Sequence, residues 1–146
     1  MLTDLLGDPF ANKDTKICID RKVLKHLLAE AESALPFEYS ALLAGRANAI
    51  SQFVAAPAAS RQPAAFVWEG PDFFASLRKI KADGLLWQGV LHTHPATLPL
   101  PSTADRQGWH YPMLSYWILS FPGGKADLRL YRYSGNRFVQ HDYEIR

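Results

Sequence analysis

The stretch Leu85–Pro95, with the sequence LLWQGVLHTHP, restricts the fold more than any other part of the chain. Its pattern predicts one strand that is bounded by Pro95, because proline lacks the backbone N–H that a sheet requires. Side chains on a strand alternate between its two faces. His92 and His94 are therefore expected to point to the same side, with Thr93 opposite, at the end of the strand.

Two other stretches have the pattern of amphipathic helices. The first, 21–35, is expected to begin after Asp20 as N-cap and to end before Pro36. The second, 71–84, opens with Pro-Asp, repeats apolar residues at helical spacing and closes at Gly84. Both helices therefore have one apolar face that must pack against another layer.

The remaining apolar stretches predict strands at 16–20, 38–45, 49–58, 116–124, 125–135 and 136–145. Strands and helices alternate at first, and strands then follow one another directly. This order indicates an α/β (α+β) fold with a single mixed β-sheet flanked by helices. The expected domain spans residues 15–146 and is preceded by an N-terminal extension at residues 1–14.

The composition narrows the classes of function. A length of 146 residues suits one domain. The 16 Lys and Arg residues are scattered along the chain and are nearly balanced by 14 Asp and Glu residues. This charge distribution argues against nucleic acid as the main partner. The single cysteine, Cys18, allows neither an internal disulfide nor a cysteine-based zinc cluster. No signal-peptide pattern or membrane-length apolar run is present, so we expect a cytoplasmic protein with no membrane partner.

A second motif, Ser102-Thr-Ala-Asp105, follows the histidines after a proline-rich stretch. By itself, Ser-x-x-Asp is typical of a helix N-terminal capping box. Together with His92 and His94, Asp105 completes a two-histidine, one-carboxylate set. That set suffices for catalytic zinc with one position left for water, and it also suits ferrous iron in an oxygenase.

Hydrolysis at such a metal requires a carboxylate base near the metal but not bound to it. Glu38 is the first candidate, because it is expected to begin an apolar strand just after Pro36. Glu69, in the stretch FVWEGPD, is the alternative base. An acidic residue near the start of a helix is favourable in any case, so the position of Glu69 has a simpler explanation.

The pattern Glu38…His92-x-His94-Pro95…Pro101-Ser102-x-x-Asp105 resembles the JAMM zinc metalloprotease family, also called JAB or MPN-plus. The segment ALPFEYSALLAG is also similar to that family's segment around its catalytic glutamate. The resemblance implies one Zn²⁺ per chain, held by His92, His94 and Asp105, in a fold similar to the cytidine-deaminase-like architecture. It implies Glu38 as general base and acid, and Ser102 as donor to the oxyanion.

The resemblance also implies a function as an isopeptidase or peptidase that acts after the C-terminal tail of a ubiquitin-like or sulfur-carrier-like protein. The short chain favours a minimal prokaryotic type. Three alternatives stay open: a hydrolase that releases a small adduct such as cysteine from a sulfur carrier, a deconjugating module of ubiquitin-like antiviral operons, and an inactive MPN-type scaffold. The sequence leaves the oligomeric state open.

Overall fold

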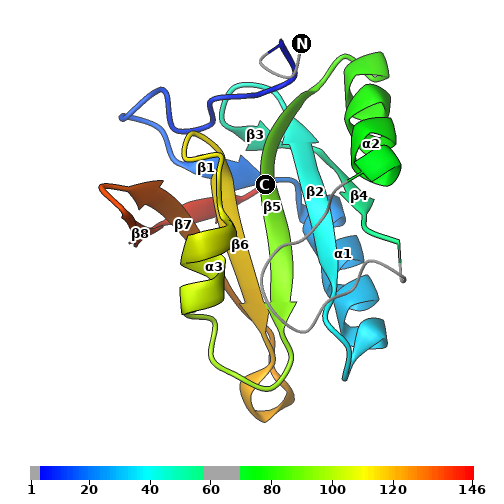
Figure 1. Ribbon diagram of the computed structural model, residues 1–146, viewed down its shortest axis with the longest axis vertical. Coiled ribbons are helices and arrows are strands. Elements are labelled where there is room, and N and C mark those ends of the chain that lie inside the picture. Colours follow the sequence, from blue (N-terminus) through cyan, green and yellow to red (C-terminus); the bar gives the residue numbers. More distant parts are fainter. Residues whose placement is uncertain (1–3, 58–69) are drawn as a thin grey trace.

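The computed structural model describes residues 4–57 and 70–146. A six-stranded mixed sheet forms its centre, in the order β4-β2-β5-β6-β7-β8 (Figure 1). The central strands β5 and β6 pair in parallel, whereas the other neighbours in this sheet are antiparallel. The strands are β2 (Ser40–Gly45), β4 (Gln52–Ala55), β5 (Leu86–His94), β6 (Ser115–Ser120), β7 (Asp127–Ser134) and β8 (Arg137–His141). The predicted central mixed sheet is confirmed.

The helices cover both faces of this sheet. α1 (Arg21–Ala34) packs with Ala41 and Leu43 of β2, and α2 (Gly70–Ala82) packs with the alternate residues Leu42 and Ala44. Because alternate residues of a strand face opposite sides, the two helices lie on opposite faces. The short helix α3 (Thr103–Gly108) connects β5 to β6 (Figure 1).

A second, three-stranded sheet adds to the predicted architecture. It consists of β3 (Ala49–Ile50), β1 (Ile17–Ile19) and β9 (Tyr143–Ile145), all parallel. The expected strand 49–58 is therefore wrong as a single element, because its residues divide at Ser51 between the small and the large sheet. The expected strand 136–145 divides in the same way at Asp142, into β8 and β9.

The described part of the N-terminal segment packs against the domain. The backbone N–H of Gly7 donates to the carbonyl of Trp87 at 2.8 Å, and that of Trp87 donates to the carbonyl of Leu5 at 2.8 Å. Phe10 joins the core on the α1 side of the sheet. The two bonds with Trp87 lie near the start of β5, while His92 and His94 lie at its end. The domain boundary after residue 14 stays a prediction.

None of the helices in the described part of the chain has the length and apolar character of a membrane span.

Candidate metal centre

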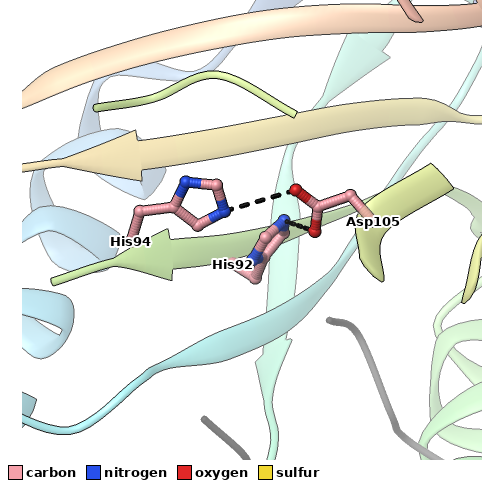
Figure 2. A group of neighbouring side chains, drawn as sticks. All are labelled: His92, His94 and Asp105. Atoms are coloured by element: carbon pink, nitrogen blue, oxygen red, sulfur yellow. Dashed lines mark ion pairs between the residues drawn. The ribbon is translucent and has the colours of Figure 1, made fainter. Parts of the chain in front are cut away.

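Two histidines and one aspartate converge at the end of β5. His92 and Asp105 are buried, with 3% and 1% of their surfaces exposed. His92 Nε2 lies 3.2 Å from Asp105 Oδ1, and His94 Nε2 lies 3.3 Å from Asp105 Oδ2. Figure 2 shows both rings directed at the carboxylate, and the three groups offer ligand atoms that all lie within 4.8 Å of one another. The structure thus brings the predicted ligands together.

The register of the strands explains why both imidazoles share one face. His92 is paired with Ser40 of β2 and with Ile118 of β6. Val90, two residues earlier, packs in the core on the α2 side, whereas Leu91 packs on the α1 side. Alternation along β5 therefore places His92 and His94 on the α2 side, which is also the side of α3.

The helix α3 supplies Asp105, and its start is a complete capping box. The Asp105 backbone N–H donates to Ser102 Oγ at 3.0 Å, and the Ser102 backbone N–H donates to Asp105 Oδ2 at 2.7 Å. The two interpretations of Ser-x-x-Asp are therefore compatible, because one carboxylate caps the helix and faces both histidines.

The loop between β5 and α3 fixes the orientation of His94. The Nδ1 atom of this histidine lies 2.9 Å from the carbonyl oxygen of Leu98. A carbonyl only accepts hydrogen bonds, so Nδ1 carries a proton, and Nε2 is the ring nitrogen that faces Asp105. Tyr131 donates its hydroxyl to the carbonyl of Pro99 at 2.6 Å, and Ser120 donates to the carbonyl of Thr97, so the loop is held at three carbonyls.

The chemistry of these residues fits a divalent metal ion. His92 Nε2 is buried and makes no hydrogen bond of acceptable geometry with the described residues, despite its distance to Asp105. Burial alone would raise the pKa of Asp105, but both histidines and the Ser102 N–H hold that pKa far below its ordinary value. Asp105 is therefore ionised, and a cation among the three groups would satisfy both the carboxylate and the buried nitrogen.

Glu38 lies beside this group, although not on the element we expected. The sequence placed it at the start of a strand, but β2 begins only at Ser40. Its neighbour Tyr39 instead extends the pairing with β5: its N–H donates to Thr93 Oγ1 at 2.8 Å, and its carbonyl accepts from the Thr93 N–H at 2.9 Å. These two bonds hold the backbone next to Glu38 against the end of β5.

The environment of Glu38 changes its acidity. Burial raises its pKa to about 7, while the charge of His94 lowers that pKa and the charge of Asp105 raises it. Both charges that act on Glu38 belong to predicted ligands, so the carboxyl group lies in their electrostatic field. A carboxyl group with a pKa near neutrality can both accept and release a proton near pH 7.

The structure describes Ser102 but not Glu69, the two other residues that the sequence predicted for the site. Ser102 is exposed, and its hydroxyl accepts a bond from Asp105 N–H, which leaves the hydroxyl proton able to donate elsewhere. Glu69, the alternative base, lies outside the described residues.

Sequence reasoning missed two residues that support the site. Thr93 binds Tyr39 as described above, and Tyr116 donates its hydroxyl to Asp105 Oδ1 at 2.9 Å. Tyr116 belongs to the buried strand SYWILS, where a tyrosine is most simply a core residue. The sequence contains no local signal for its contact with Asp105, because the two residues come from different elements.

The model of a family described as prokaryotic homologs of the JAB domain matches residues 20–132. A search of curated proteins found no match.

Three solved structures share the fold. A protein from Desulfitobacterium hafniense has a TM-score of 0.78 at 24% identity, over 88% of this chain and 92% of that one. A JAB1/MPN domain protein from Archaeoglobus fulgidus has a TM-score of 0.60 at 24% identity, over 87% and 96%. A structure described as a metalloprotease-like zinc site in the proteasome and signalosome has a TM-score of 0.56 at 20% identity, over 90% and 99%.

Proposed function

The chain belongs to the family of prokaryotic homologs of the JAB domain, and from this we propose that it is a zinc-dependent isopeptidase or peptidase. Its substrate would be the bond after the C-terminal tail of a ubiquitin-like or sulfur-carrier-like protein. The observation that carries the proposal is the convergence of His92, His94 and Asp105 beside a carboxyl group, Glu38, whose pKa is raised to about 7.

In this proposal, His92, His94 and Asp105 would hold the zinc ion. When bound, zinc activates a water molecule near neutral pH and polarises the scissile carbonyl group. The chain orients these ligands through the Leu98 carbonyl on His94 and the Ser102 N–H on Asp105. Such supporting bonds fix the tautomer and the direction of each ligand.

Glu38 is the general base and then the general acid. It removes a proton from water as the water attacks, and it delivers that proton to the leaving amine. Burial raises the pKa of Glu38, which favours both duties, because the group must accept the proton in one step and release it in the next. The Ser102 hydroxyl, whose proton is not used by the helix cap, donates to the oxyanion that develops at the substrate carbonyl.

The rim of the site supports a protein tail as the substrate. The turn between α1 and β2 and the loop between β5 and α3 lie at the same end of the molecule (Figure 1). They carry exposed apolar side chains, with exposed fractions of 68% for Phe37, 60% for Leu98 and 49% for Leu100. Apart from Glu38, the segments 35–38 and 95–101 contain no charged residue. An extended apolar segment fits such a rim better than a highly charged one.

Metal analysis and a cleavage assay test this function together. Protein purified without chelator should contain about one zinc per chain and should cleave a member of a panel of ubiquitin-like and sulfur-carrier fusions. Release of a small adduct such as cysteine, without cleavage of protein fusions, would favour the sulfur-carrier hydrolase. Iron in place of zinc would favour an oxygenase, and absence of metal would favour a scaffold.

A further inference from the structure

Both oxygens of the Asp105 carboxylate receive a hydrogen bond from the protein. Ser102 N–H donates to Oδ2 at 2.7 Å, as part of the helix cap. Tyr116 donates its hydroxyl to Oδ1 at 2.9 Å from the neighbouring strand β6. One donor comes from the start of the helix that carries Asp105, and the other comes from the sheet, so the Tyr116 bond connects α3 to β6.

The direction of the Tyr116 bond is determined by chemistry. An ionised carboxylate can only accept, so the phenol must donate. Tyr116 is fully buried, with 0% exposure, so water does not replace the bond.

The ring of Tyr116 is itself tightly located. Its centroid lies 5.2 Å from that of His92, 4.9 Å from that of Trp109 and 4.6 Å from that of Phe138. The hydroxyl therefore has little freedom to leave Asp105. Because the same ring packs edge-on against His92, one side chain contacts two of the three predicted ligands.

We propose that Tyr116 is a positioning residue of the metal centre, which holds Asp105 Oδ1 toward His92 through its hydroxyl. This inference rests on the metal site of the proposed function. Without the Tyr116 bond, Asp105 Oδ1 loses its donor from the sheet, while Oδ2 keeps the bond from the Ser102 N–H. Tyr116 does not contact substrate, so its effect should appear in metal binding and ligand geometry.

The test compares Tyr116→Phe with Tyr143→Phe. The first removes the hydroxyl but keeps the ring that packs on His92. The second removes a hydroxyl that donates to the carbonyl of Leu128, away from the ligands, at 3.2 Å. Competition with a chromophoric chelator should show Zn²⁺ affinity lowered about 10- to 100-fold in Tyr116→Phe and unchanged in Tyr143→Phe.

The absorption bands of bound Co²⁺ report ligand geometry separately from affinity. They should shift in Tyr116→Phe and match those of the wild type in Tyr143→Phe. Wild-type Zn²⁺ affinity and Co²⁺ bands in folded Tyr116→Phe would overturn the inference.

If Tyr116→Phe does not fold, the hydroxyl proton of Tyr116 is followed by NMR in the wild type. Its resonance should move on Zn²⁺ addition, and no movement would overturn the inference.

These results are distinguishable from failure of the proposed function. A wild type that binds Zn²⁺ but cleaves no fusion contradicts the peptidase assignment and leaves the role of Tyr116 testable. A Tyr116→Phe variant with normal Zn²⁺ binding contradicts only the role of Tyr116.

Discussion

At the scale of single residues, Thr93 connects the segment that carries Glu38 to the strand β5, which carries His92 and His94. It lies between two predicted ligands but points to the other face of β5, as the alternation predicted. There its hydroxyl accepts the N–H of Tyr39, the residue next to Glu38. This side chain, together with the bond from the Thr93 N–H to the Tyr39 carbonyl, therefore joins the backbone next to the proposed base to the strand of the proposed metal ligands. The sequence located Thr93 correctly but could not reveal this partner, which lies 54 positions away.

Thr93→Val removes that acceptor while keeping the side-chain shape. We expect the free energy of unfolding to fall by about 1–3 kcal/mol, since a buried N–H loses its acceptor. We also expect kcat to fall about tenfold or more, because Glu38 is less well placed. Zn²⁺ affinity should be nearly unchanged. Thr93→Ser, which keeps the hydroxyl, is the control. Equal losses of kcat in both variants would contradict this role.

The acidity of Glu38 makes a prediction for the metal-free protein. Burial raises its pKa from 4.5 to about 7, so the folded state binds a proton more tightly than the unfolded state. The stabilising contribution of Glu38 is then fully present below about pH 4.5 and is lost as the pH rises through about 7. Glu38→Gln lacks this titration.

Chemical denaturation of both proteins with chelator present, from about pH 5 to 8, measures the effect. The free energy of unfolding of the wild type, minus that of Glu38→Gln, should decrease as the pH rises. A constant difference over this range would show that the pKa of Glu38 is not raised.

At the scale of elements, the sequence predicts some strands much better than others. β5 was predictable because one apolar run ends at a proline. The segments 49–58 and 136–145 were expected to be single strands, yet each divides between two sheets. Their apolar pattern continues across Ser51 and Asp142, so nothing local marks the break. Each division depends on the pairing of β3 or β9 with β1, which is distant in the sequence. A local pattern of apolar residues carries no information about such pairing.

The loop between β5 and α3 carries a prediction about substrate binding. Leu98 is exposed while its own carbonyl anchors His94. Leu98→Ser removes an apolar contact with the tail and should raise KM about tenfold, given about 1.5–3 kcal/mol for burying a leucine side chain. Zn²⁺ content should not change, because the backbone carbonyl remains.

Val139→Ser is the matched control for Leu98→Ser, since Val139 is an exposed apolar residue on β8 with 38% exposure. Steady-state cleavage of a fusion substrate measures both variants. An unchanged KM in Leu98→Ser would remove the loop from the substrate-binding surface.

At the scale of the whole molecule, the topology assembles the site from three parts of the chain. Antiparallel pairing of β2 with β5 brings the segment of Glu38 to the histidines. The parallel pair β5 and β6 requires a crossover connection, and α3 in that connection brings Asp105 back to the end of β5. The catalytic role of Ser102 stays a prediction, whereas His92, His94 and Asp105 were predictable as neighbours because they lie close in sequence with characteristic spacing. Tyr116 was not, because only the sheet brings it to Asp105.

The rate of cleavage by zinc-loaded Glu38→Gln tests the central claim most directly. The variant should bind as much zinc as the wild type, because Glu38 is not a proposed ligand. Its cleavage of the best ubiquitin-like or sulfur-carrier fusion should fall by at least about 100-fold, the usual contribution of a general base. Cleavage at the wild-type rate, with zinc content equal in both proteins, would contradict the account.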